Sequence, residues 1–361
     1  MNTKFKINLI GDRLMIQYIR EGVIYAGEDH FIFKSQDGGA GWEEVCRLKT
    51  RAKTSFGRLG SRILHSKPLR RLRRNIGIHN MVVLKSGTVL MQFDGIYRYD
   101  GNGKYADFIF DFRPHHIIGP LKNGFAVDDR TDNVYFGEYN NSRPYAVRIF
   151  RGTDDGRKWE MCYRFPEGRV KHVHSIVPDP YRNRIWVCTG DNDQESGLFY
   201  TDDDFQTLEL FAGGDQSWRM VSLIPTETAL YWGSDAGQDA PSDCRNYLYK
   251  WDFGKKQKKQ LAYIDKPAYY STQLRNGAMV IGVTYEPAVR HEVEKSAELW
   301  FSTNGEQWEK IVVLPFQPSN RTIGTKYATV CLPLGDGSVN SVFFTPLNVD
   351  KYDFKLVCAT K

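Results

Sequence analysis

The fold of this 361-residue chain is predicted from a turn that recurs along it, Ser35-Gln36-Asp37-Gly38-Gly39-Ala40-Gly41-Trp42. Related turns occupy residues 152–159, 201–208 and 302–308, and the last of them is one residue shorter. The starting positions of the four turns are 117, 49 and 101 residues apart. A unit of about 50 residues accounts for these spacings if one copy also carries an insert. The chain is therefore predicted to repeat one small structural unit.

Each turn combines an oxygen-bearing side chain with a tight bend, and three of the four copies close on a tryptophan. A Ser or Asp side chain can hydrogen-bond the turn backbone, glycine adopts positive φ without strain, and tryptophan packs between strands. The pattern resembles the Asp-box, or bacterial neuraminidase repeat, written Ser-x-Asp-x-Gly-x-Thr-Trp. The resemblance implies a β-propeller of the sialidase-like superfamily, of the type that acts on glycans. The Arg-Ile-Pro segment of sialidases is missing near the start of this chain, so sialidase activity itself is not expected.

Further repeats indicate how many units there are. Degenerate turns at residues 97–103 and 247–252 fill the longer gaps. Apolar strand starts recur in step with the turns, at 81–84, 117–120, 175–177, 220–223, 271–274 and 328–331, after an N-terminal unit at 14–48. We expect an all-β, seven-bladed β-propeller, with six blades as the alternative, forming one domain over residues 1–361. An N-terminal strand near Lys6–Leu9 is expected to complete the last blade, because closing the ring removes exposed strand edges.

The basic character of the chain is local. Its net charge is +6, but residues 49–74 hold ten Lys and Arg and no Asp or Glu, and the remainder carries −4. A general nucleic-acid-binding surface is therefore not indicated. The basic insert, at about 49–78, could contact a polyanion or an anionic membrane surface. The alternative is that the insert is a solvent-exposed loop without a binding function.

Cysteine usage points to a reducing compartment. The six cysteines are scattered without a CxxC pair, and several lie within apolar strand patterns, so they are predicted to be buried free thiols. No signal-peptide pattern opens the chain, and no apolar run approaches the roughly 18–20 residues that span a bilayer. We expect a cytoplasmic monomer.

Two registers of the repeat place polar side chains at one mouth of the propeller channel. The first strand of each blade lines the channel, and the residues just before the apolar starts are His79, His116, His174, Arg219, Tyr270 and Tyr327. The second strand runs back antiparallel, so its end reaches the same rim. Acidic residues at those ends are Asp94, Glu138, Asp191, Asp235 and Glu286. This mixture is typical of acid–base chemistry, although a wet, polar channel without catalytic function would also explain it.

Other residues near this rim could also bind ligands, namely His172, Gln216 and Trp232. His172 and His174 share one face of a strand and could hold a divalent metal with Glu138, Asp191 or His116. No third ligand has a defined spacing, so no cofactor is predicted. Arg219, with Gln216 and Trp232 nearby, suits a sugar that carries a carboxylate. Pairing of Arg219 with Asp235 or Asp191 is the structural alternative.

The leading hypothesis is an enzyme that cleaves an acidic polysaccharide or oligosaccharide. In a lyase version, Arg219 neutralises a uronate, His174 or His79 removes its proton, and Tyr270 or Tyr327 protonates the leaving oxygen. In a hydrolase version, two of Glu138, Asp191 and Asp235 serve as acid and base or nucleophile, with His116 and His172 at the substrate. The alternatives are a non-catalytic propeller that binds a glycan or protein, and a metal-dependent enzyme that uses His172 and His174.

Overall fold

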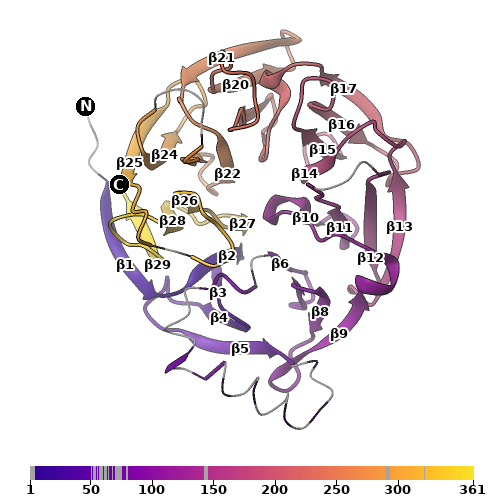
Figure 1. The fold of residues 1–361 in the computed structure, drawn as a ribbon, viewed down its shortest axis with the longest axis vertical. Coiled ribbons are helices and arrows are strands. Elements are labelled where there is room, and N and C mark those ends of the chain that lie inside the picture. Colours follow the sequence, from indigo (N-terminus) through magenta and orange to yellow (C-terminus); the bar gives the residue numbers. More distant parts are fainter. Residues whose placement is uncertain are drawn as a thin grey trace.

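The computed structural model describes residues 5–49, 51, 54, 56, 60, 63, 65, 66, 68, 69, 75–78, 80–141, 145–288, 293–320 and 322–361. The ring formed by these residues is all-β, as expected, and includes the short 3₁₀ helices η1 (Arg113–His115), η2 (Lys122–Gly124) and η3 (Gln216–Trp218). Its sheets stand in a ring around a common axis, with an edge strand of each sheet nearest the centre (Figure 1). This radial arrangement of four-stranded antiparallel sheets is that of a β-propeller.

Four sheets of the ring are antiparallel meanders in chain order. The first contains β10 (Phe125–Asp128), β11 (Asn133–Gly137), β12 (Arg148–Thr153) and β13 (Lys158–Arg164). The next contains β14 (His172–Asp179), β15 (Arg184–Gly190), β16 (Gly197–Thr201) and β17 (Glu209–Gly213). It is followed by β18 (Ile224–Pro225), β19 (Ala229–Gly233), β20 (Tyr247–Asp252) and β21 (Gln257–Tyr263). The last of these sheets contains β22 (Ala268–Gln273), β23 (Met279–Val283), β24 (Ser296–Ser302) and β25 (Glu309–Pro315).

A nine-stranded sheet contains two consecutive meanders. One is β2 (Met15–Arg20), β3 (Val23–Glu28), β4 (Phe31–Ser35) and β5 (Glu43–Leu48). The other is β6 (Asn80–Val83), β7 (Val89–Gln92), β8 (Gly95–Tyr99) and β9 (Tyr105–Asp111). The outer strands β5 and β9 pair in parallel through Arg47 and Leu48, which joins the two meanders. The short strand β27 (Leu334–Gly335) adds to β2 on the inner side.

The ring is closed by the N-terminal strand. β1 (Lys6–Asp12) is the outer strand of a sheet whose other members are β26 (Thr329–Cys331), β28 (Ser341–Leu347) and β29 (Lys355–Thr360). β1 pairs antiparallel with β29, from Lys6 opposite Thr360 to Asp12 opposite Lys355. The prediction that a strand near Lys6–Leu9 completes the last sheet is therefore confirmed, and the two chain ends lie on the same side of the ring (Figure 1).

The four repeated turns all connect the third and fourth strands of a sheet. In the first turn, Ser35 Oγ accepts from Gly39 N at 2.8 Å, and Asp37 Oδ1 accepts from Gly41 N at 2.9 Å. Equivalent bonds join Thr201 with Phe205 N, Asp203 with Thr207 N, Ser302 with Gly305 N, and Asn304 with Gln307 N. In these three turns the hydroxyl and the carboxylate or amide thus satisfy the turn backbone, as the sequence predicted. In the turn at 152–159, the Asp155 carboxylate instead accepts from Ser86, Thr88 and Arg98.

Aromatic side chains fill the space between neighbouring sheets. The indole of Trp159, at the start of β13, lies 6.0 Å from the ring of Phe110 in β9 and 5.6 Å from that of Phe136 in β11. Its Nε1 donates to the carbonyl of Gly156, and this hydrogen bond stabilises the turn that precedes β13. Rings that bridge sheets in this way make each blade depend on the next, because a single four-stranded sheet cannot bury its own faces.

Two predicted strand starts are wrong. Residues 117–120 and 220–223 are not in strands, and the inner strands of those sheets, β10 and β18, begin at Phe125 and Ile224. His116 adopts a left-handed conformation with φ of 49°, and Ile118 N donates to Glu138 Oε1 at 3.2 Å. These local bonds replace the pairing that a strand would need, and η2 then leads the chain into β10.

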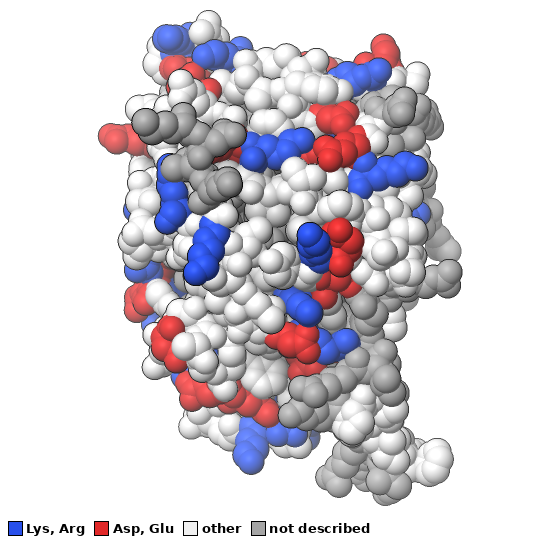
Figure 2. Space-filling view, turned by 90° about the vertical axis from the view of Figure 1, so that its left-hand side faces the viewer, with Lys and Arg blue, Asp and Glu red and all other residues white. Residues whose placement is uncertain are grey.

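The described part of the basic insert is attached to the ring. Arg51 forms ion pairs with Asp94 at 3.0 Å and Asp111 at 2.7 Å, and His65 bonds Asp29 at 2.7 Å. Most of its Lys and Arg residues lie outside the described residues. On the side of the molecule shown in Figure 2, basic and acidic side chains are interspersed.

All six cysteines are free. Four are buried and two are half-buried, in agreement with the predicted free thiols. Within the described ranges, no helix is long and apolar enough to cross a membrane.

Candidate active site

A cavity of about 710 Å³ lies at one mouth of the ring. Its wall includes six of the residues predicted from the sequence: His174, Asp191, Arg219, Asp235, Tyr270 and Tyr327. His174 and Tyr270 lie near the starts of the inner strands β14 and β22, whereas Asp191 and Asp235 follow the second strands β15 and β19. The two predicted registers therefore meet at one rim, because adjacent antiparallel strands bring a start and an end together.

Arg219 is the electrostatic centre of the cavity and is surrounded by carboxylates. It follows η3, and its guanidinium lies 3.2 Å from Asp235, 3.0 Å from Asp239 and 3.3 Å from Asp191 Oδ1. Its Nη1 also donates to the backbone carbonyl of Asp191 at 3.0 Å. Burial opposes the charge of Arg219, but Asp235, Asp191 and Asp239 outweigh it and raise the pKa of the guanidinium. The pairing alternative left open by the sequence is the one observed.

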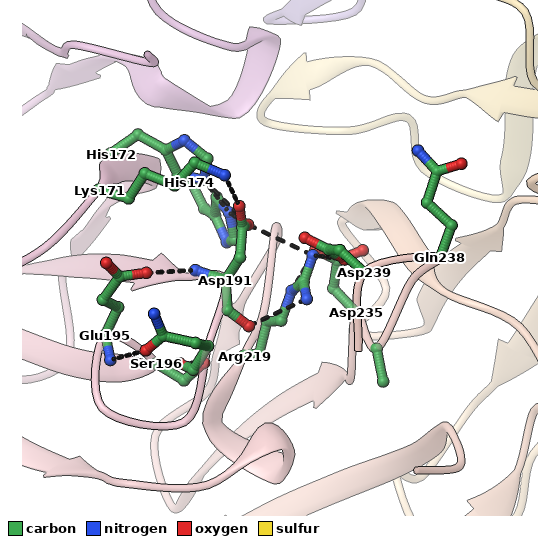
Figure 3. Close-up of polar contacts among 12 residues, drawn as sticks. Lys171, His172, His174, Asp191, Glu195, Ser196, Arg219, Asp235, Gln238 and Asp239 are labelled. Atoms are coloured by element: carbon green, nitrogen blue, oxygen red, sulfur yellow. Dashed lines mark hydrogen bonds and ion pairs between the residues drawn. The ribbon is translucent and has the colours of Figure 1, made fainter. Parts of the chain in front are cut away.

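Asp191 is held by donors on several sides (Figure 3). Lys171 Nζ lies 2.6 Å from its Oδ2, while Nε2 of His172 and Nε2 of His174 lie 3.0 and 3.3 Å from its Oδ1. Burial would raise the pKa of Asp191, yet its contacts with His172 and His174 hold that pKa well below the usual range. Burial lowers the pKa of His174 to about 4, against the opposing effect of Asp191.

Asp235 and Glu286 form a second carboxyl pair in the same cavity. Both are about 95% buried. Burial raises the pKa of Asp235 well above its ordinary value; Arg219 opposes the shift and the nearby Glu286 adds to it. Glu286 accepts a hydrogen bond from the hydroxyl of Tyr269 on Oε1 and one from Gln238 N, at 2.8 Å, on Oε2. Acceptance on both oxygens suits an ionised carboxylate.

Tyrosines complete the wall of the cavity. Tyr327 accepts a hydrogen bond from Gln238 Nε2 at 3.2 Å, and burial with the nearby Glu286 raises the pKa of Tyr327 to about 12. Burial likewise raises the pKa of Tyr270, which lies beside Cys331. The ring of Tyr139 stacks on His172 with centroids 4.0 Å apart. The raised pKa values keep the hydroxyls of Tyr270 and Tyr327 protonated near neutral pH, so each hydroxyl is able to donate a hydrogen bond.

Besides His172, four predicted site residues do not line the cavity. Glu138 is fully buried in a two-pronged pair with Arg148, at 2.6 and 2.9 Å. His116 is exposed, and its carbonyl accepts from the same Arg148. Trp232 is buried in the core, stacked on Trp218 and donating to a backbone carbonyl. Gln216 donates to the Asp191 carbonyl at 2.9 Å and so positions that residue from behind.

Two other predicted residues, His172 and His79, are not among the described residues that line the cavity. His172 is fully buried behind Asp191 and reaches the cavity only through that carboxylate. His79 lies outside the described residues.

The sequence reasoning missed several residues that the fold brings to the cavity. Glu286 occupies the same register as Asp191 and Asp235, so its position was visible, but nothing singled it out as functional. Lys171, Tyr139, Gln238, Asp239 and Tyr269 also line the wall. Gln238 and Asp239 lie in the long β19–β20 connection, whose path no repeat pattern predicts. Residues 75–77, at the end of the basic insert, also form part of the wall.

A smaller cavity of about 350 Å³ lies at the opposite ends of the inner strands. Its wall is mainly apolar and includes several prolines, and its charged residues include Asp128 and Arg130, which pair with each other at 2.7 Å. The convergence of carboxylates, histidines and tyrosines therefore distinguishes the larger cavity.

Solved structures share this fold at low sequence identity. The fold is a β-propeller. The GH74 xyloglucanase of Xanthomonas campestris aligns with a TM-score of 0.59 and 13% identity over 96% of this chain and 52% of its own. A GH74 enzyme of Niastella koreensis aligns at 0.56 and 12% identity, over 85% and 47% of the two chains. This chain thus spans about half the length of those enzymes. U3-55K aligns at 0.55 and 10% identity, over 98% of both chains.

No family model matches the sequence, and no curated protein matches it.

Proposed function

We propose that this chain is a glycoside hydrolase whose active site is the 710 Å³ cavity of a seven-bladed propeller. The observation that carries the proposal is the pair Asp235 and Glu286, two carboxyl groups in one cavity whose surroundings favour opposite protonation states. Such a pair supplies the acid and the base, or nucleophile, that hydrolysis of a glycosidic bond requires. The seven blades are the five separate four-stranded sheets and the meanders β2–β5 and β6–β9.

Asp235 is the proposed general acid. Burial raises its pKa and so favours the protonated acid, and its position in the cavity wall allows transfer of that proton to a departing sugar oxygen. Arg219, 3.2 Å from Asp235 Oδ2, stabilises the carboxylate that remains after the transfer. Glu286 is the ionised partner, oriented by Tyr269 and by the backbone of Gln238.

The proposed substrate is a neutral glycan. The guanidinium of Arg219 was expected to bind a sugar carboxylate, but it is committed to Asp191, Asp235 and Asp239. Lys171 is likewise committed to Asp191, and Lys122 to backbone carbonyls. In the described part of the wall, each Lys and Arg side chain is already paired with a carboxylate or a carbonyl, so none is available to bind a sugar carboxylate. This argues against an acidic sugar and against the lyase version. Tyr139, Tyr269 and Tyr327 offer aromatic faces and hydroxyls that suit uncharged sugar rings.

The fold comparisons give further support for hydrolysis. Two of the structures that share the fold are GH74 enzymes, and one of them is named as a xyloglucanase. At 12–13% identity they support only the compatibility of this architecture with glycan cleavage.

The test is a reducing-end assay of the purified chain against a panel of neutral and acidic polysaccharides. We expect new reducing ends from a neutral substrate, without absorbance from unsaturated uronates. Asp235→Asn and Glu286→Gln should each lower kcat by about 10²–10⁴-fold. Asp202→Asn, which changes a carboxylate paired with Arg184 on the outside of the ring, should leave kcat unchanged. Binding to a glycan without turnover would instead establish a non-catalytic propeller.

A further inference from the structure

His172 and His174 are both oriented by backbone carbonyls. Nδ1 of His172 lies 2.9 Å from the carbonyl oxygen of Asn140, and Nδ1 of His174 lies 3.1 Å from that of Met220. A carbonyl oxygen only accepts hydrogen bonds, so in both rings Nδ1 must carry the hydrogen. In a neutral imidazole this leaves a lone pair on Nε2.

The two Nε2 atoms then face each other and a carboxylate oxygen. They are 2.9 Å apart, and Asp191 Oδ1 lies 3.0 Å from one and 3.3 Å from the other. Three lone-pair-bearing atoms cannot approach this closely in a buried place without a cation among them. A single proton can bridge two of these atoms and leaves the third without a donor, unless that third atom is Asp191 Oδ1, which Arg219 Nη2 approaches at 3.3 Å. A metal ion satisfies all three.

The spacing of the three atoms suits a tetrahedral metal site. Ligands bound to zinc at about 2.0–2.1 Å lie about 3.3 Å from one another in a tetrahedral arrangement. The three observed separations are within a few tenths of an ångström of that value. Hydrogen bonding of each Nδ1 to a backbone carbonyl is also the usual way in which histidine ligands are oriented.

We propose that His172, His174 and Asp191 bind one divalent transition metal ion, with zinc favoured by this set of two imidazoles and a carboxylate. His174 and Asp191 line the cavity, so the fourth coordination position faces it. Lys171 occupies the other oxygen of Asp191, Oδ2, at 2.6 Å, and thereby leaves Oδ1 for the ion. Arg219 Nη2 also lies 3.3 Å from Oδ1. Because a carboxylate oxygen has two lone pairs, Oδ1 can contact both Arg219 and the ion.

The surroundings hold this geometry in place. The ring of Tyr139 stacks on His172 and covers it. Gly190, the last residue of β15, lies so close to the imidazole of His174 that a Cβ there would come within 2.5 Å of Cε1. The backbone and the stacked ring leave the two imidazoles little freedom to turn away from the proposed ion.

A second cluster of His and Asp, whose ligand atoms also lie within 4.8 Å of one another, makes a different set of contacts. In the cluster of Asp29, His30 and His65, each Nδ1 points at an oxygen of Asp29, at 3.0 and 2.7 Å. Each contact is an ordinary hydrogen bond from an imidazole to a carboxylate, and Asn75 Nδ2 also donates to Asp29 at 3.0 Å. This cluster therefore serves as the matched control.

The first experiment uses the unmodified protein. The chain is freed of metal with a chelator, titrated with Co²⁺, and followed by visible absorption. We expect tetrahedral d–d bands that saturate at about one ion per chain and disappear when Zn²⁺ is added. Absence of these bands, with no Co²⁺ or Zn²⁺ retained after gel filtration, would overturn the proposal and mean that the cluster shares a proton. The readout does not depend on turnover, so it stands or falls separately from the hydrolase proposal.

Variants then locate the ion. His172→Ala and His174→Ala should each weaken Co²⁺ binding by more than about tenfold, measured by calorimetry on protein whose circular dichroism matches the parent. Asp191→Asn, which keeps the side-chain shape, provides a ligand change if a histidine variant fails to fold. His65→Ala should bind Co²⁺ like the parent. Equal loss in His65→Ala, or retention of binding in Asp191→Asn and both histidine variants, would refute the assignment.

Discussion

Asp235 lies 3.2 Å from Nε of Arg219, and both side chains are more than 90% buried. The same guanidinium contacts Asp191 and Asp239, so one cation separates three carboxyl groups. Coulomb repulsion among these groups would be strong without it, because the low-dielectric interior screens charges weakly. The shape of the cavity thus depends on Arg219.

Replacement of Arg219 by Met should therefore be costly. We expect the free energy of unfolding to fall by about 3–5 kcal/mol, the range found when one partner of a buried ion pair is removed. Urea denaturation measures the change. In the matched control, Arg184→Met, the lost pair with Asp202 is partly exposed and should cost about 0–1 kcal/mol. Similar costs in the two variants would show that Arg219 does not hold the cavity together.

The pH dependence of hydrolysis should report Asp235. Burial raises the pKa of Asp235 above its ordinary value, so hydrolysis that needs the protonated acid should fall as pH rises through that raised value. A profile of kcat/KM from pH 4 to 10 tests this. The alkaline limb should be missing from the residual activity of Asp235→Asn. An unchanged limb in that variant would assign the acid to another group.

Asp29 should contribute to acid sensitivity. Burial opposes its charge, but hydrogen bonds with His30 and His65 hold the pKa of Asp29 well below the usual range. A depressed carboxyl pKa stabilises the folded state above the unfolded value of about 3.9, and this contribution is lost as pH falls below it. Thermal denaturation from pH 7 to 3 should therefore show a steeper loss of stability in the parent than in Asp29→Asn. Parallel curves would contradict the prediction.

Lys122 should change stability in the same direction, but in an alkaline pH range. Its buried ammonium donates to the carbonyl of Ile16 at 3.1 Å and to Gln17, and burial lowers its pKa to about 8. Between pH 8 and about 10.4 the unfolded chain binds a proton that the folded chain has lost, so stability should rise with pH there. Urea denaturation at pH 7.5 and 9.5 measures this rise. Lys122→Met should abolish it, and a persistent rise in that variant would assign it to another group.

A methyl group at Gly190 should disturb the histidine site. The added Cβ would meet His174 Cε1 at 2.5 Å and Arg219 Cγ at 3.1 Å, so one side chain must move. We expect Gly190→Ala to cost about 1–3 kcal/mol of stability, as overpacking usually does, and to weaken Co²⁺ binding. Gly22→Ala provides a control for backbone strain, since φ there is +85° and nothing lies within 4 Å. Co²⁺ binding that survives in Gly190→Ala would show that His174 is not tightly held.

Local patterns determined much of the architecture. The repeated turns, the spacing of about 50 residues and the alternation of apolar strands predicted an all-β ring, because turn chemistry and strand period act over a few residues. The ring-closing strand β1 and the convergence of His174, Asp191, Arg219 and Asp235 followed from the same repeat. Antiparallel neighbours fix which strand ends meet, whatever the side chains are.

The direction and partner of each side chain were decided only by the tertiary structure. Glu138 shares the register of Asp191, yet it turns to Arg148 and is buried there, while Trp232 turns into the core. Arg219 is occupied by carboxylates from other segments, and the histidines are oriented by carbonyls 32 and 46 residues away in the chain. Such partners meet through the packing of neighbouring blades. A short-range sequence pattern specifies where a side chain is attached to the ring, but its contacts depend on residues that only the folded chain brings close.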